Sequence, residues 1–215
     1  MTDQTKNNFN INEDQPTEWF EKLYASSNNE GEGVPWANMS THPIFKNWLN
    51  KNELNGNSKS ALVVGCGMGD DALELEQLGF QVTAFDVAQS AIDLCKKRFP
   101  HSSVDFVQAD LLAGIPEWKN KFDFILEIYT IQALPPKYEN TLVQNLSSFL
   151  APKGELMLIT EVQFATRNFE VGPPWLLNPS YIGAFENLGL SKMYQDIDTS
   201  TTMGDESHLT IFKRK

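Results

Sequence analysis

Apolar and polar positions divide the chain into an N-terminal part with helical spacing and a longer part in which two periodicities alternate. In the N-terminal part, the stretches 16–27 and 42–54 place apolar side chains three or four residues apart, which predicts two short helices. From residue 60 onward, short apolar runs alternate with amphipathic stretches, the pattern of parallel βαβ units. We expect strands over 61–65, 81–87, 104–110, 122–130 and 155–162, and helices over 70–79, 89–99 and 138–150.

The C-terminal part follows a different pattern. A helical stretch over 178–189 precedes two apolar strands, 190–198 and 208–215, which are joined by the polar turn TSTTMGDE. A turn this short makes the two strands antiparallel, because a parallel pair needs a crossover of about a dozen residues or more. The sequence therefore predicts an α/β fold with helices on both faces of a mostly parallel sheet that ends in an antiparallel hairpin.

Length and composition favour one domain. A chain of 215 residues with 41% apolar content can bury one sizeable core and is short for two. We predict a single domain over 16–215, with a helical N-terminal cover (16–58) and a core (59–215), after a polar, disordered leader (1–15). No apolar run reaches the length of a membrane span and the N-terminus shows no targeting pattern, so we expect a cytoplasmic protein.

Charge and residue types exclude some classes of function. A net charge of −11, from 17 basic and 28 acidic residues, opposes nucleic-acid binding. The three histidines, His42, His101 and His208, are far apart and form no zinc motif, so no metal site is expected. Cys66 and Cys95 lie in apolar segments and are expected to be packed, reduced thiols. The oligomeric state is not written in any of these features.

Three glycines on alternate positions follow the first apolar strand, in the stretch LVVGCGMGDD over 62–71. Such a turn allows a ligand to approach bare backbone at a helix N-terminus, although a plain strand-to-helix turn would look similar. Asp86 ends the next strand, 21 positions after Gly65, where a carboxylate can accept both hydroxyls of a ribose. The pair of features indicates a nucleoside-containing ligand.

The residues after the glycines favour one nucleoside over another. A dinucleotide motif wants a small residue at position 70, where this chain has Asp70 followed by Asp71, and two carboxylates would repel a pyrophosphate. S-adenosylmethionine carries a sulfonium cation and a zwitterionic amino acid instead. Asp110, at the end of the third strand, is suited to accept a hydrogen bond from the adenine amino group, although it could equally be a turn residue.

Taken in order, the stretches VVGCGMGDDA, VTAFDVAQSAI, FVQADLL and FDFILEIYTIQALPP…LAPKGELMLIT resemble the class I S-adenosylmethionine-dependent methyltransferases over about residues 16–215. The resemblance implies a Rossmann-like, seven-stranded sheet with its last strand inserted antiparallel. It also implies S-adenosylmethionine as cofactor and S-adenosylhomocysteine as product. The residues then expected to bind the donor are Trp36, Gly65, Cys66, Gly67, Gly69, Asp86, Val87, Asp110, Leu111 and Glu127.

Two further stretches, VPW at 34–36 and GPPW at 172–175, resemble the branch that contains thiopurine and halide/thiol methyltransferases, which act on small molecules. The acceptor segment departs from that branch. Ile128 falls where the halide/thiol enzymes place a tyrosine, and Glu139 falls where an arginine is usual. The resemblance therefore implies a small acceptor, such as a thiol, a halide or another soft nucleophile, and leaves its identity open.

Methyl transfer from a sulfonium is an in-line displacement that mainly requires positioning and the exclusion of water. Glu127 and Tyr129, near the end of the fourth strand, are candidate catalytic bases, although they could instead cap backbone and line a wall. Tyr129, Gln132 and Trp175 are the candidate acceptor-binding residues. Trp36 and Trp175 are expected to fold over the ligands, or else to bury apolar area beneath loops.

Three other functions share parts of this pattern. A non-catalytic S-adenosylmethionine-binding regulator would lack an acceptor pocket. A nicotinamide-dependent oxidoreductase would need a different residue at position 70. An aminopropyltransferase tends to carry acidic pairs in the segment that here reads EIYTIQALPP, in which only Glu127 is acidic.

Overall fold

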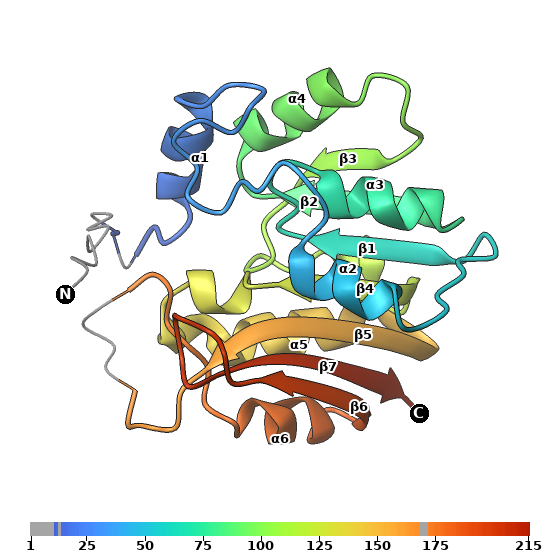
Figure 1. The fold of residues 1–215 in the computed structure, drawn as a ribbon, viewed down its shortest axis with the longest axis vertical. Coiled ribbons are helices and arrows are strands. Elements are labelled where there is room, and N and C mark those ends of the chain that lie inside the picture. The colour runs from blue at the N-terminus through green and yellow to red at the C-terminus, as the bar shows by residue number, and fades with distance from the viewer. Residues whose placement is uncertain (1–10, 13, 168–171) are drawn as a thin grey trace.

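The computed structural model describes residues 11–12, 14–167 and 172–215. Most of the leader expected over 1–15 lies outside these described residues. In the part that is described, a central twisted sheet is covered by helices on both faces, and α1 (Glu18–Ala25) of the N-terminal segment lies at the carboxyl ends of the parallel strands (Figure 1).

The sheet has seven strands in the order β3-β2-β1-β4-β5-β7-β6. The first five run parallel to one another, and β7 is antiparallel to both of its neighbours. This confirms the expected mostly parallel sheet with a C-terminal hairpin. The strands are β1 (Ser60–Val64), β2 (Gln81–Asp86), β3 (Asp105–Gln108), β4 (Phe122–Ile128), β5 (Leu150–Val162), β6 (Leu190–Asp198) and β7 (Glu206–Arg214).

The helices form one layer on each face of the sheet. One buried cluster joins the sheet to α2, α3 and α4, and a second cluster joins the opposite face to α5 and α6. The described helices are α1 (Glu18–Ala25), α2 (Pro43–Leu49), α3 (Asp70–Gln77), α4 (Gln89–Arg98), α5 (Glu139–Phe149) and α6 (Tyr181–Glu186), with 3-10 turns η1 (Pro116–Trp118), η2 (Ile131–Ala133) and η3 (Pro136–Tyr138).

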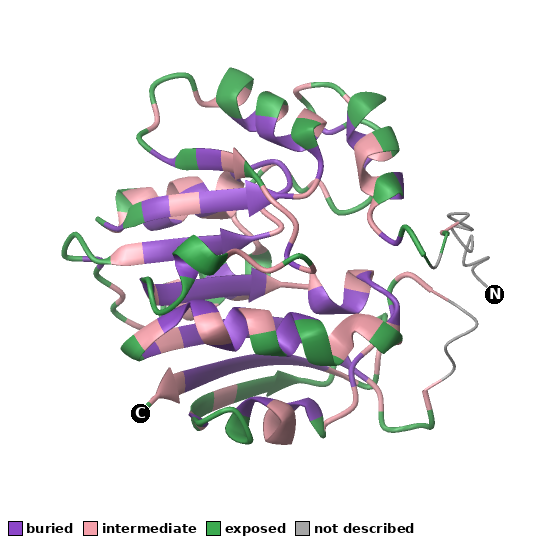
Figure 2. Cartoon of the chain, turned by 180° about the vertical axis from the view of Figure 1, so that it is seen from behind, coloured by how far each residue is buried: buried purple, intermediate pink, exposed green. Residues whose placement is uncertain are grey.

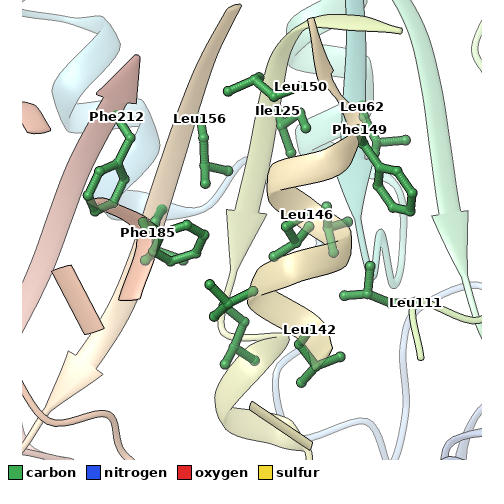
Figure 3. Close-up of a cluster of buried hydrophobic side chains, with 14 of the residues drawn as sticks. Leu62, Leu111, Ile125, Leu142, Leu146, Phe149, Leu150, Leu156, Phe185 and Phe212 are labelled. Carbon is green, nitrogen blue, oxygen red and sulfur yellow. The ribbon is translucent and has the colours of Figure 1, made fainter. Parts of the chain in front are cut away.

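The second cluster shows how the sequence pattern becomes a core. Leu142, Leu146 and Phe149 recur at helical spacing on α5 and are fully buried, or nearly so, against the apolar side chains of the strands (Figure 3). Exposed positions of the helices face outward while the central strands are almost entirely buried (Figure 2). Burial on both faces explains why the strands read as continuous apolar runs.

The strand order changes direction between β1 and β4, which are direct neighbours. From β1 the chain crosses one face of the sheet through α3, and from β4 it crosses the other face through α5. A crevice opens beyond the carboxyl ends of two strands whose connections diverge in this way. The topology thus places the candidate site at the ends of β1 and β4.

Several strand boundaries differ from the expected ones, and two of these differences have a clear local cause. The stretch APKG (151–154), between the predicted helix 138–150 and the predicted strand 155–162, lies inside β5, whose first residue Leu150 pairs with Phe122 across a register shift. Lys153 takes the left-handed conformation there, with φ of 64°. The fourth strand ends at Ile128 because Tyr129, with φ of 61°, leaves the extended region.

Candidate functional site

A cavity of about 500 Å³ lies beyond the carboxyl ends of β1, β2 and β4. The sheet contributes the glycine turn and the strand ends, and the N-terminal cover contributes the opposite wall. The cover residues that line it are Thr17, Trp19, Phe20, Tyr24, Pro35, Trp36, Ala37, Asn38, Met39, Ser40 and His42. Pro173, Pro174 and Met203 close the side toward β5 and the β6–β7 turn.

The glycine turn needs residues without a side chain. Gly67 and Gly69 have φ of 53° and 88°, in the left-handed region that most residues avoid. A Cβ on Gly67 would lie 3.0 Å from the Tyr24 hydroxyl, and one on Gly69 would lie 2.9 Å from the sulfur of Cys95. The turn therefore presents bare backbone to the cavity and packs closely against α1 and α4.

Asp86 connects this turn to the end of β2. Its carboxylate is buried and accepts hydrogen bonds from the backbone N–H groups of Gly67 and Ala88, each at 3.0 Å. Burial raises the pKa of Asp86 to about 6, although the backbone N–H donors act in the opposite direction. Asp110, at the end of β3, accepts a hydrogen bond from the N–H of Leu112 at 2.8 Å. Both carboxylates line the cavity.

Asp70 does not act as the free charge that the sequence argument assumed. Its two oxygens lie 2.8 and 3.0 Å from the guanidinium of Arg98, which also donates to the carbonyl of Met68. The repulsion of a pyrophosphate by Asp70 is therefore offset by a paired cation. Asp71 accepts the backbone N–H of His42 at 2.7 Å, and burial raises the pKa of Asp71 to about 6.

Tyr129 lies at the opposite end of the cavity from Asp110, on the β4 side of the strand order. Its hydroxyl donates to the carboxylate of Glu161 at 3.0 Å, and its ring meets the ring of His42 edge-on, with centroids 5.2 Å apart. Burial and the nearby Glu161 raise the pKa of Tyr129 far above its usual value. A phenol in this state stays protonated near neutral pH, which argues against the expected base role.

Gln132 lies beside Tyr129 and also lines the cavity. Its side-chain oxygen accepts hydrogen bonds from the hydroxyl of Thr160 at 2.7 Å and from the N–H of Glu161 at 2.9 Å. The end of β5 is thus tied to the segment that follows β4, which fixes this wall of the cavity.

Two expected site residues are not on the cavity wall. Glu127 is fully buried, accepts the N–H of Ile131 at 2.9 Å and so caps η2. Burial raises its pKa to about 7. Trp175 is also buried, its backbone N–H donates to the backbone carbonyl of Gln132 at 2.7 Å, and the preceding prolines reach the cavity in its place. These contacts favour the structural alternative for both residues.

Trp36 does line the cavity and is 40% exposed. Its indole N–H donates to the Tyr24 hydroxyl at 2.8 Å, and its ring meets the rings of Trp19 and Phe20 edge-on. The remaining expected donor-binding residues, Gly65, Cys66, Gly67, Gly69, Asp86, Val87, Asp110 and Leu111, all lie on the wall.

Several wall residues of the cover, above all Tyr24 and His42, could not be predicted from the sequence. Tyr24 was part of a predicted helix, but helical spacing does not say which face of the helix meets a ligand. His42 is a lone histidine in the sequence, far from His101 and His208 and without a metal-binding motif. Because His42 directly precedes Pro43 at the start of a helix, its sequence position indicates a helix-capping residue and does not indicate a binding role.

The wall fits the donor that the sequence predicted. Bare backbone at the turn allows a close approach, and Asp86 and Asp110 place carboxylate hydrogen-bond acceptors on the same wall, near the ends of β2 and β3. Among the described residues, no cluster of His, Cys, Asp and Glu side chains is arranged to hold a metal ion. None of the helices described is long and apolar enough to cross a membrane.

Comparison with known proteins agrees with this geometry. Residues 61–154 match the family model described as "Methyltransferase domain". The chain is 26% identical over 156 residues to a probable thiol methyltransferase 2 of Arabidopsis thaliana, and 23% identical over 146 residues to thiocyanate methyltransferase 1 of Brassica oleracea. These alignments cover 70% and 66% of this chain, and 66% and 62% of the two relatives, so the chain spans just under two thirds of their length.

Solved structures share the fold. The N-methyltransferase NodS of Bradyrhizobium japonicum, in complex with S-adenosylhomocysteine, aligns with a TM-score of 0.67 at 16% identity, covering 92% of this chain and 97% of that chain. A structure described as "Conversion of a Disulfide Bond into a Thioacetal Group during Echinomycin Biosynthesis" aligns with a TM-score of 0.72 at 20% identity, covering 93% of both chains. The neighbours confirm the predicted seven-stranded, Rossmann-like architecture.

Proposed function

We propose that this chain, which belongs to the class I S-adenosylmethionine-dependent methyltransferases, transfers a methyl group to a sulfur nucleophile on a small molecule. The observation that carries the proposal is one continuous cavity, in which the glycine turn, Asp86 and Asp110 at one end share a wall with Tyr129 and Gln132 at the other. The similarity to thiol and thiocyanate methyltransferases favours sulfur as the acceptor atom.

The contacts at the strand ends indicate which end of the cavity binds the donor. Asp86 and Asp110 keep unused acceptor capacity after their backbone hydrogen bonds, since each carboxylate can accept about four in total. Tyr24 and Trp36 close the cavity over the glycine turn from the cover side. These contacts support the assignment of the expected donor-binding residues on the wall.

S-adenosylmethionine supplies an electrophilic methyl group on a positively charged sulfur. The protein's part is to orient the acceptor for in-line attack and to keep water away. Tyr129 is fixed by Glu161, and Gln132 is fixed by Thr160, so both present a rigid wall to the acceptor. Pro173, Pro174 and Met203 add apolar surface, which favours a small and largely apolar acceptor.

The alternatives gain no support. A non-catalytic donor-binding regulator would not need the space that continues past the glycine turn toward Tyr129. Neither the family match nor the solved structures point to a nicotinamide-dependent oxidoreductase. We also propose that the protein is cytoplasmic and that nucleic acid is not its substrate. The net charge of −11 supports the exclusion of nucleic acid.

The proposal is tested by incubating the full chain with labelled S-adenosylmethionine and a set of small thiols, halides, thiocyanate and phenols, with a total protein and RNA extract as the comparison. We expect S-adenosylhomocysteine and a methyl thioether to form with thiols. Methyl transfer only to protein or RNA would contradict the proposal, as would donor binding without transfer to any small acceptor.

The same assay includes a donor-site variant. Asp86→Asn should weaken binding of S-adenosylhomocysteine by about 10- to 100-fold in calorimetry, because hydrogen bonds to a charged acceptor contribute about 1.5–3 kcal/mol each. Asp105→Asn is the matched control, since Asp105 is exposed at the start of β3. Equal affinity of the two variants would show that Asp86 does not bind the donor.

A further inference from the structure

His42 lies at the end of the cavity where the acceptor must bind. The strand order β3-β2-β1-β4-β5 places Asp110 and Asp86 on one side of the glycine turn and Tyr129 on the other. His42 contacts Tyr129 ring to ring and lines the same wall. If the nucleoside occupies the Asp86 side, the reactive end of the donor and the acceptor face the His42 side.

The backbone around His42 is held on both sides. Its N–H donates to the carboxylate of Asp71 at 2.7 Å, and its carbonyl accepts the N–H of Lys46 at 2.9 Å in the first turn of α2. The edge-on contact with Tyr129, which is itself bonded to Glu161, fixes the ring. An imidazole with this support has a defined orientation toward the cavity.

The ring itself has spare hydrogen-bonding capacity. Nδ1 is buried and has no hydrogen-bond partner among the described residues, although buried polar atoms are nearly always paired. Burial lowers the pKa of His42 to about 4, so the ring is neutral at physiological pH. A neutral imidazole has one nitrogen that accepts, and because Nδ1 is closed off, Nε2 is the nitrogen left to meet a ligand.

The charges around His42 disfavour an anion. Tyr129 contacts the ring edge-on, Glu161 lies behind Tyr129, and the carboxylate of Asp71 accepts the backbone N–H of His42. Lys46, on the same helix, is paired with Glu74 at 2.7 Å. Within the described part of the chain, no lysine or arginine lines the cavity. A thiolate, halide or thiocyanate ion would therefore find no cationic side chain there, whereas a neutral thiol needs none.

We infer that His42 is a catalytic residue that binds the S–H group of a neutral thiol and removes its proton during methyl transfer. This inference rests on the proposed function and specifies its acceptor. The S–H bond breaks and the proton passes to the imidazole, while a sulfur electron pair forms the new bond to the methyl carbon. The bond from that carbon to the donor sulfur breaks, its electron pair stays on that sulfur, and the imidazolium then releases its proton to solvent.

The test compares two thiols of similar size that differ in ionisation. Phenylmethanethiol, an alkyl thiol, is mostly protonated at about pH 7.5, whereas 4-nitrothiophenol is already a thiolate. We expect His42→Gln to lower kcat for phenylmethanethiol by about 100-fold, the usual size of a general-base effect, and to change kcat for 4-nitrothiophenol by less than about threefold. The affinity for S-adenosylhomocysteine should stay within about twofold in both His42→Gln and His42→Asn.

The pH profile provides a readout that a structural role would not change. In His42→Gln, only the thiolate of phenylmethanethiol can react, so the rate should rise about tenfold per pH unit between about pH 6 and 8. The native protein should show a much flatter profile, because it uses the neutral thiol. His101→Gln, which changes an exposed histidine, is the control and should behave as the native protein.

Equal losses with both thiols, or parallel pH profiles of the native protein and His42→Gln, would overturn the role of His42 while leaving the proposed function intact. A native protein that methylates thiocyanate but neither thiol would also overturn the role of His42 and leave the proposed function intact. A native protein that binds S-adenosylhomocysteine but methylates no small acceptor of the earlier set would contradict the proposed function, and the inference about His42 would fall with it.

Discussion

Three carboxyl groups around the cavity have pKa values raised by burial, to about 6 for Asp71 and Asp86 and about 7 for Glu127. The folded chain therefore keeps protons on these groups at pH values where the unfolded chain has lost them. Linkage then requires the free energy of unfolding to fall as pH rises from about 4 to about 7. Asp71 and Asp86 line the cavity, whereas Glu127 lies behind its wall and caps η2.

The variant Glu127→Gln isolates the contribution of Glu127 to this pH dependence from the contributions of Asp71 and Asp86. The amide keeps an oxygen that can accept the N–H of Ile131 and cannot ionise. Between about pH 5 and 8, the native protein should lose about 2–3 kcal/mol of stability relative to the variant, because each pKa unit corresponds to about 1.36 kcal/mol. Urea denaturation at four pH values measures this difference. Glu186→Gln, at an exposed glutamate, should run parallel to the native curve, and a parallel curve for Glu127→Gln would refute the assignment.

At the scale of elements, the glycine turn is held by the two helices that flank it. Asp70 lies in the first turn of α3 and Arg98 in the last turn of α4, and their side chains are only 16% and 11% exposed. The second donor contact of Arg98, to the Met68 carbonyl, extends the same tie to the turn itself. The acidic residue after the glycines therefore braces the turn, a role that differs from repelling an anionic ligand.

Arg98→Met should destabilise the fold by about 2–4 kcal/mol, because it leaves the partly buried carboxylate of Asp70 without its cation. The double variant Asp70→Asn with Arg98→Met should recover at least half of that loss. Urea denaturation gives both values. Lys46→Met is the matched control, since Lys46 is 49% exposed in its pair with Glu74 and should cost less than about 1 kcal/mol. If Arg98→Met and Lys46→Met lowered the free energy of unfolding equally, the Arg98–Asp70 pair would stabilise the fold no more than an exposed ion pair does.

At the scale of the whole molecule, the cavity forms between two parts of the chain. The family match covers residues 61–154, but one wall comes from the cover, before that range. Glu21 on α1 anchors the cover to the start of α4, through the N–H and the hydroxyl of Ser90 at 3.1 and 2.5 Å. The aromatic residues of the cover pack on one another across the cavity mouth. A bound donor would therefore contact both parts at once.

Hydrogen exchange measured by mass spectrometry can detect this bridging. Addition of S-adenosylhomocysteine should slow amide exchange by about tenfold or more in residues 17–42 and 65–71, because the ligand stabilises the closed cavity against local opening. The outer strand β6 (Leu190–Asp198), none of whose residues lines the cavity, serves as the internal control and should change little. Uniform protection, or protection without any change in 17–42, would contradict a donor held between cover and sheet.

The sequence by itself determined the order and kind of most elements, because apolar periodicity directly reflects which faces are buried. Its glycine spacing and the carboxylates at strand ends also placed Gly67, Asp86 and Asp110 on one wall, since parallel strands bring their carboxyl ends to a common edge. The antiparallel hairpin followed from the length of a turn. The disordered leader, and the division of 16–215 into cover and core, stay predictions.

Only the tertiary structure decided which side chains face the cavity. Glu127 and Tyr129 are two residues apart, yet the first is buried under η2 and the second lines the wall, because the left-handed backbone at Tyr129 ends the strand between them. The pairing of Asp70 with Arg98, and the meeting of His42 with Tyr129, join residues far apart in the chain. Local sequence patterns do not predict such contacts, because the contacts depend on how the elements pack against one another.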